Sequence, residues 1–193
     1  MAPTATSSAS STRTMPERPA VSARPFVVHV AKLRRVLGTR WHEVRSGVID
    51  DLACSASAVP DGAMVQADVT LESISGGVSV AGFVTAPWTG ECRRCLETAS
   101  GTLKIPVREL YTDDGDGEET YPLTNDDVDL EPLAHDAVLL ELPIAPVCDE
   151  GCRGLCPLCG VNRNEQTCTC EMPRDGRWAA LDVLRVPDLG SGN

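Results

Sequence analysis

Nine cysteines are the residues of this sequence best suited to chemistry, and eight of them lie in two clusters. The first cluster is CRRC at 92–95, and the second runs through VCDEGCRGLCPLCGVNRNEQTCTC at 147–170. Two cysteines separated by two residues can place both sulfur atoms on one tetrahedral ion, because a tight turn directs backbone N–H groups back at the thiolates. In CPLCG, Pro157 presets the turn and Gly160 can adopt the left-handed conformation that follows it. The pattern therefore predicts metal–thiolate sites.

The number of cysteines in the clusters favours two metal ions, because a closed structural zinc site takes four ligands. The eight candidate ligands are Cys92, Cys95, Cys148, Cys152, Cys156, Cys159, Cys168 and Cys170. The preferred division gives the first four to one Zn²⁺ and the last four to a second, because the second set is then local in sequence. A rival division joins the two C-x-x-C pairs and leaves Cys148, Cys152, Cys168 and Cys170 as the other site. Spacing alone leaves both divisions open, and Cys54 is interpreted as a small buried residue.

Other roles for the cysteines fit the sequence less well than zinc binding does. An odd count without a secretory hydrophobic region disfavours a disulfide scaffold and indicates a reducing compartment, which we expect to be the cytoplasm. A thioredoxin-like role is disfavoured because CRRC lies between strands and not at the start of a helix, and iron–sulfur ligation would use the same residues. No P-loop, nucleophile elbow or H-E-x-x-H motif is present. We therefore expect no enzyme, no catalytic residue and no small-molecule substrate.

Composition sets limits on the partners. Seventeen basic against twenty-eight acidic residues give a net charge of −11, which argues against a protein whose whole surface coats nucleic acid. Hydrophobic residues make up 42% and aromatics only 4%, so the core must be mainly aliphatic. No apolar run approaches the roughly 18 residues of a membrane span, and we expect no membrane association.

The pattern along the chain predicts an α+β fold. Residues 1–24 are predicted to form a disordered tail, and residues 187–193 a flexible end. One domain is expected over residues 25–186. Within it, residues 25–110 are mainly β, with period-two runs at 64–75, 77–88 and 101–111 that predict an antiparallel meander. Residues 111–128 form an acidic loop. Residues 129–186 hold a helix, the cysteine-rich zinc-binding segment and a second short helix around 177–185.

The helix after the acidic loop has recognisable ends. Asp129 is the candidate N-cap, and Pro143 terminates the helix. The apolar positions Leu133, Ala137 and Leu140 have helical spacing, so the helix is expected to lie on the sheet.

One basic stretch interrupts the acidic background. Residues 24–45 contain six Lys and Arg residues against the single acid Glu43. If the protein contacts RNA, Arg34, Arg35 and Arg40 are the expected contacts. The alternative is a solvated turn whose arginines pair with the acidic residues at 113–119.

Taken together, these motifs resemble the bacterial YceD family of large ribosomal RNA subunit accumulation proteins. The resemblance rests on CRRC at 92–95, DLEPLAHDAVLLELPIAPVC at 129–148, CRGLCPLCGVNRN at 152–164, the CTC ending at Cys170 and the closing RWAALDVL. It covers about residues 25–186. It implies a non-catalytic cytoplasmic factor in ribosome assembly. The separation of basic and acidic segments suggests that such a factor binds a ribosomal protein, a large-subunit rRNA precursor, or both. The alternative function is a zinc-stabilised protein–protein adaptor without RNA contact.

Overall fold

A long antiparallel sheet dominates the computed structural model, which describes residues 24–117, 119–171, 176–177 and 181. Its main strands are β2 (Arg40–Gly47), β4 (Val65–Ile74), β5 (Gly77–Glu91) and β6 (Thr98–Thr112). The order is β2-β4-β5-β6-β7, where the two-residue β7 (Tyr121–Pro122) pairs in parallel with the end of β6. The short β3 (Ser57–Ala58) pairs with β5 near its C-terminal end. The predicted meander is confirmed for β4, β5 and β6.

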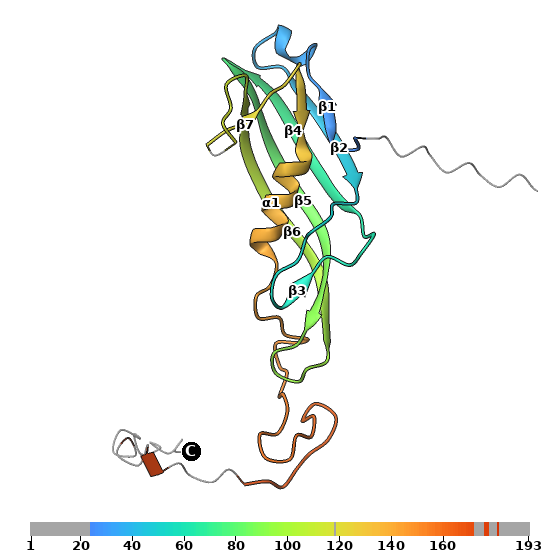
Figure 1. Ribbon diagram of the computed structural model, residues 1–193, viewed down its shortest axis with the longest axis vertical. Helices are drawn as coiled ribbons and strands as arrows, with labels where there is room; N and C mark the ends of the chain where they lie inside the picture. Colours follow the sequence, from blue (N-terminus) through green and yellow to red (C-terminus); the bar gives the residue numbers. More distant parts are fainter. Residues whose placement is uncertain (1–23, 118, 172–175, 178–180, 182–193) are drawn as a thin grey trace, which may run out of the picture.

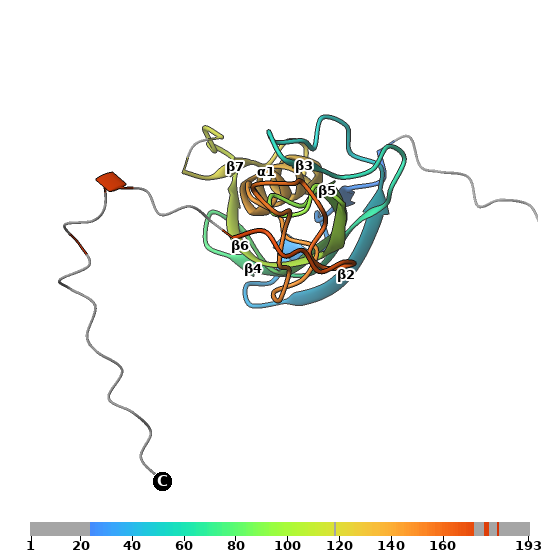
Figure 2. The same cartoon turned by 90° about the horizontal axis from the view of Figure 1, so that it is seen from below.

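One α-helix fills the concave face of this sheet. Helix α1 (Leu130–Glu141) begins at the predicted N-cap, where the Asp129 carboxylate accepts a hydrogen bond from the Glu131 N–H at 3.1 Å. The sheet curves around the helix, as the view along the molecule shows (Figure 2). The core between them is mainly aliphatic, as the composition predicts, with Phe26 and Tyr111 as its large aromatic members.

One short strand pairing and a 3-10 helix close the end of the molecule farthest from the cysteines (Figure 1). Strand β1 (Val27–His29) pairs antiparallel with β8 (Asp127–Asp129), and the 3-10 helix η1 (Leu33–Arg35) follows β1. The Tyr111 hydroxyl donates to the Asp129 carbonyl oxygen at 2.9 Å, and its ring stacks on Tyr121 with centroids 5.2 Å apart. These contacts tie the start of α1 to the end of β6.

Two sequence-based expectations need correction. The described residues are sheet-dominated, with the α-helix α1 and short 3-10 segments where an α+β fold with a few short helices was expected. On α1, Leu140 is 85% exposed, because the buried stripe runs through Leu130, Leu133, Ala134 and Val138. A hydrophobic residue on a helix does not have to face the core, and the spacing of Leu133 and Ala137 fits both stripes.

Some expectations lie outside the described residues. These are the tail before residue 24, the flexible end at 187–193 and nearly all of the second helix around 177–185. Among the described residues, no helix combines the length and apolar character needed to cross a membrane.

Candidate metal centres

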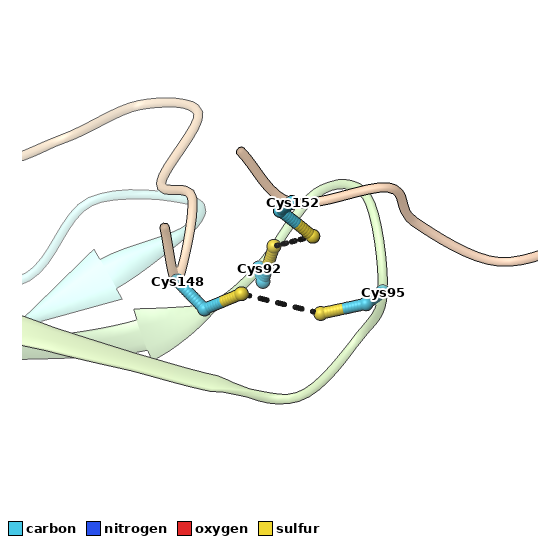
Figure 3. A group of neighbouring side chains, drawn as sticks. All are labelled: Cys92, Cys95, Cys148 and Cys152. Atoms are coloured by element: carbon cyan, nitrogen blue, oxygen red, sulfur yellow. Dashed lines mark hydrogen bonds between the residues drawn. The ribbon is translucent and has the colours of Figure 1, made fainter. Parts of the chain in front are cut away.

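The first group of cysteines joins two segments that are far apart in sequence. Cys92 and Cys95 lie on the turn between β5 and β6, and Cys148 and Cys152 lie on the segment that follows α1 (Figures 1 and 3). The sulfur of Cys92 is 3.9 Å from that of Cys152, and the sulfur of Cys95 is 3.5 Å from that of Cys148. All four sulfur atoms lie within 4.8 Å of one another. Cys92, Cys95 and Cys152 are buried, at 0%, 3% and 6% exposure, and Cys148 is exposed.

These separations fit one tetrahedral ion. A zinc–sulfur bond of about 2.3 Å in a tetrahedron puts the sulfurs about 3.8 Å apart. A disulfide would need about 2.05 Å, and all nine cysteines are free thiols. A polynuclear iron–sulfur cluster distributes its cysteines over several iron atoms and needs a wider cage. The group therefore has the size of a site for a single ion.

The second group is local in sequence and more exposed. It contains Cys156, Cys159, Cys168 and Cys170, whose sulfur atoms also lie within 4.8 Å of one another. Cys156 is buried, Cys168 is intermediate, and Cys159 and Cys170 are exposed. The structure thus brings the eight sulfurs together in the preferred division, and the rival division would require different neighbours.

A specific hydrogen-bond pattern shapes the first cysteine turn. The Cys92 N–H donates to the Glu97 carbonyl oxygen at 2.8 Å, and the Leu96 N–H donates to the Cys92 carbonyl oxygen at 2.9 Å. Leu96, directly after the second cysteine, has φ +63°. A leucine in the left-handed region is strained, because its Cβ crowds the backbone.

The second cysteine turn repeats the pattern at the same offsets. The Cys156 N–H donates to the Val161 carbonyl oxygen at 2.8 Å, and the Gly160 N–H donates to the Cys156 carbonyl oxygen at 2.9 Å. Gly160 has φ +74°, as its position in CPLCG predicts, without the strain of Leu96. Two different stretches of sequence therefore form turns with the same backbone hydrogen bonds around the first cysteine of each pair.

Backbone N–H groups favour ionised sulfur in both turns. Burial raises the pKa of Cys92, but hydrogen bonds from backbone N–H groups, led by that of Arg94, more than offset it and bring the pKa to about 6. In the second group the N–H groups of Cys159 and Leu158 lower the pKa of Cys156 to about 6. Each group therefore contains a thiol that ionises readily, as a metal ligand must.

One other thiol in each group has a strongly raised pKa. The sulfur of Cys95 raises the pKa of Cys148 to about 12, and that of Cys159 raises the pKa of Cys170 to about 12. Four sulfur atoms at these distances cannot all be anionic without a cation between them. Metal binding to either group would therefore release protons.

Arg94 links the first turn to the segment that carries the later cysteines. Its guanidinium donates to the carbonyl oxygens of Glu150 at 3.1 Å and Cys152 at 3.0 Å, and its own carbonyl accepts from the Leu155 N–H at 2.9 Å. Gly154 packs against it with φ +69°, and a Cβ there would lie 2.8 Å from the Arg94 carbonyl oxygen. This contact requires glycine.

Asn164 completes the surroundings of the first group. Its side-chain amide donates to the sulfur of Cys152 at 3.2 Å and lowers the pKa of that thiol. Its side-chain oxygen accepts from the Arg153 N–H at 2.7 Å. Sequence reasoning did not assign roles to Arg94, Gly154 and Asn164. Their position between and beside cysteines was the available signal, but a spacing argument considers only the ligands.

Cys54 lies apart from both groups. Its sulfur is 3.4 Å from the Ser57 hydroxyl and 3.6 Å from the Pro143 carbonyl oxygen, and it packs partly buried against the main core. Its environment is that of a packing residue.

The three arginines predicted to contact RNA have different surroundings. Arg34 forms ion pairs with Asp113 and Asp126, at 2.6 Å each, and these hydrogen bonds raise its pKa. Arg40 pairs with Glu72 at 3.1 Å. Arg35 is exposed. The alternative to RNA contact was pairing with the acidic residues at 113–119. Arg34 fits it through Asp113, and its second partner, Asp126, lies outside that range.

Comparison with known proteins gives the family. The fold and the two groups of four thiols define a β-sheet protein with candidate metal centres, and the family model described as large ribosomal RNA subunit accumulation protein YceD matches residues 80–185. This range includes both cysteine groups and α1. The chain belongs to the YceD family.

Curated relatives extend the match. An uncharacterised protein of Mycobacterium tuberculosis (strain ATCC 25618 / H37Rv) is 36% identical over 182 residues, which cover 86% of this chain and 84% of the relative. The large ribosomal RNA subunit accumulation protein YCED homolog 1, chloroplastic, of Arabidopsis thaliana is 26% identical over 160 residues, 65% of this chain and 50% of that protein. The Bacillus subtilis protein YlbN is 27% identical over 131 residues, 64% of this chain and 73% of that protein. No solved structure matches.

Replacing Leu96 with glycine should stabilise the protein. Leu96 is 57% exposed and has a positive φ, so Leu96→Gly relieves backbone strain at little cost in packing. We expect the free energy of unfolding to rise by about 0.5–1 kcal/mol, measured by urea denaturation at constant metal content.

Leu158→Gly is the matched control in the second turn. Leu158 is 51% exposed and is not among the residues with positive φ, so glycine should lower the free energy of unfolding there by about 0.5–1 kcal/mol. Equal destabilisation by the two changes would contradict the assignment of strain to Leu96.

Proposed function

We propose that this protein binds two Zn²⁺ ions, one in each group of four thiols. The observation that supports this most directly is the sulfur spacing of 3.5 and 3.9 Å in the first group, which suits one tetrahedral ion. Cys92, Cys95, Cys148 and Cys152 would hold the first ion, and Cys156, Cys159, Cys168 and Cys170 the second. Zinc would supply a cross-link and a fixed charge there, because four thiolates fill its coordination shell.

The proposed role of the first ion is structural. It would hold the β5–β6 turn against the segment after α1, across sequence separations of 53 and 60 residues. With all four positions taken by sulfur, neither ion could bind and activate water, so we propose a non-catalytic protein. We further propose that residues 25–186 act as one domain.

We propose that the protein is a cytoplasmic ribosome-biogenesis factor supporting accumulation of large-subunit ribosomal RNA. The family description and the name of the Arabidopsis relative support this role. The direct partner would be a ribosomal protein, a large-subunit rRNA precursor, or both. The net charge of −11 and the ion pairs of Arg34 favour a basic protein as the main contact, with Arg35 as the arginine best placed for RNA.

A second candidate function is a zinc-stabilised adaptor between proteins, without RNA contact. The observation in its favour is the use of Arg34 and Arg40 in ion pairs within the chain. The two functions differ in whether binding to precursor particles depends on phosphate contacts.

Purified protein should contain about two zinc equivalents per chain. Elemental analysis of protein produced without added zinc measures this, and Cys54→Ser should retain both equivalents because Cys54 lies outside the groups. Cys92→Ser should lose close to one equivalent. Iron with visible absorbance, or less than half an equivalent of any metal, would contradict the proposal.

Cys95→Ser should destabilise the domain more than Cys170→Ser. Cys95 is buried at 3% exposure and closes a separation of 53 residues to Cys148, whereas Cys170 is exposed and its group spans only 156–170. Loop closure alone accounts for a difference of roughly 1 kcal/mol, and burial adds to it. Thermal unfolding of the two variants checks this, and equal losses would argue against it.

Binding to precursor ribosomal particles should depend on the basic stretch if RNA is contacted. The variant with Arg34→Ser, Arg35→Ser and Arg40→Ser should bind less tightly and flatten the dependence of log K on log salt by about two to three. Arg35→Ser alone should account for about one, without the loss of ion pairs. Co-sedimentation across a salt series measures this, with thermal unfolding as the folding control. A triple variant that co-sediments like the parent favours the adaptor.

A further inference from the structure

In the part of the chain that the structure describes, strand β6 leaves most of one edge of the sheet open. It pairs with β5 along its whole length, from Thr98 to Thr112, but on its other side β7 pairs only with Tyr111 and Thr112. Among the described residues, no other segment pairs with 98–110. Open edges of this length are uncommon, because they offer unpaired N–H and C=O groups to other chains.

The outward-facing groups can be identified from the hydrogen bonds. The Leu123 N–H donates to the Thr112 carbonyl oxygen at 2.8 Å, so the carbonyl of Thr112 faces away from β5. The β5–β6 register is unbroken, and strand polarity alternates, so the backbone groups of Lys104, Arg108 and Leu110 face the same way. Pro106 is an even-numbered position of β6 like these three, so its backbone nitrogen faces away from β5. The lack of an N–H there therefore costs no hydrogen bond to β5.

A groove runs beside this edge, between β6 and α1. From β6 it is lined by residues that include Ile105, Val107 and Glu109, and from α1 by residues that include Asp136 and Leu140. It continues toward β7 past Tyr121 and Glu119. Figure 2 shows β6 beside the helix on the inner side of the sheet. The 85% exposed Leu140 therefore lies at the mouth of a groove.

The groove is acidic. Its described lining includes Glu109, Glu119, Asp136 and Glu141, and Arg108 is its one basic residue. The Asp136 carboxylate accepts a hydrogen bond from the Tyr121 hydroxyl at 3.1 Å, which fixes one negative charge at the centre. This charge repels phosphate and attracts lysine and arginine side chains.

The opposite face of the same edge carries the opposite charge. Lys104 lies over the Phe83 ring, with its ammonium 4.7 Å from the centroid. Arg108, which also borders the groove, has the same parity as Lys104 in β6 and is exposed. Like charges would meet if two copies paired through this edge, so a second copy of the chain is disfavoured. An added strand would instead meet acids on its inner face and bases on its outer face.

We propose that an extended segment of another protein adds to the β6 edge as a strand. Its lysine or arginine side chains alternate with uncharged residues, so that the basic ones face the acidic groove against α1. Main-chain hydrogen bonds to the outward groups of residues 104–110 supply affinity, and the groove selects the charged face. The inference identifies a second site, remote from both cysteine groups, and it needs neither zinc nor the ribosomal role.

A synthetic peptide whose lysines all lie on one face of an extended strand tests this directly. The probe is acetyl-(Lys-Thr)₄-amide, and the control is acetyl-Lys-Lys-Thr-Thr-Lys-Lys-Thr-Thr-amide, which has the same composition without a single basic face. Amide hydrogen exchange of the full chain is read by NMR. In the free protein the amides of Lys104, Arg108 and Leu110 should exchange quickly, and those of Ile105 and Val107 slowly. The probe should protect the first three by about tenfold or more, and the control should not.

Matched variants separate edge pairing from general charge attraction. Arg108→Pro removes an outward N–H within the groove, and Thr102→Pro removes an N–H of the same parity on the same edge outside it. We expect the first to weaken probe binding by about tenfold and the second to change it less than about twofold. Glu109→Gln with Glu141→Gln should weaken binding similarly, whereas Asp50→Asn with Asp61→Asn, exposed acids outside the groove, should not.

The outcomes decide the proposal either way. Protection of the outward amides together with sensitivity to Arg108→Pro supports strand addition. The proposal is overturned by absence of probe binding, by equal binding of the control peptide, or by binding without amide protection. It is also overturned if an octauridylate protects the same amides, because the edge would then contact nucleic acid. Zinc content and co-sedimentation with precursor particles are separate measurements, so failure here leaves the function proposed above standing.

Discussion

The contact between the β5–β6 turn and the segment after α1 determines the arrangement of everything that follows it. Four sulfur atoms meet there, and their spacing exists only because two fifteen-residue strands carry Cys92 and Cys95 to the end of the sheet. The Arg93 N–H donates to the Pro146 carbonyl oxygen at 2.9 Å, and Arg94 holds the chain as far as Leu155. The second cysteine turn thus begins from a fixed point.

The hydrophobic core and the cysteines stabilise different parts of the molecule. The main core packs α1 against the sheet, whereas a small separate cluster of Cys92, Cys95, Ala99 and Cys152 is buried at the far end, and Trp88 packs against both. An aliphatic core beside α1 cannot order the cysteine segment, because that segment has few apolar residues to bury. Its order comes from hydrogen bonds and, in our proposal, from metal ligation.

Local patterns in the sequence predicted much of this structure. The N-cap at Asp129, the three long strands and the left-handed Gly160 depend on neighbouring residues, so the sequence displays them. The preferred division of the cysteines rested on locality and agrees with the observed groups. The bounds of strand β2 and the exposure of Leu140 could not be predicted in this way, because both depend on contacts between elements: β2 pairs with β4, and α1 buries a different stripe against the sheet. Leu96 is similar: a leucine adopts a left-handed conformation only where surrounding contacts impose it.

The order of the ligands along the chain has a consequence for biosynthesis. Every cysteine of the first group precedes every cysteine of the second, and all the strands of the sheet that carries Cys92 and Cys95 precede Cys148 in the chain. A nascent chain would therefore expose the thiols of the β5–β6 turn first, then the complete first group, and only afterwards the second group. If metal is bound during translation, as our proposal allows, an ion taken up early would meet the four thiols of the first group, and the one other thiol then made, Cys54, lies apart from both groups.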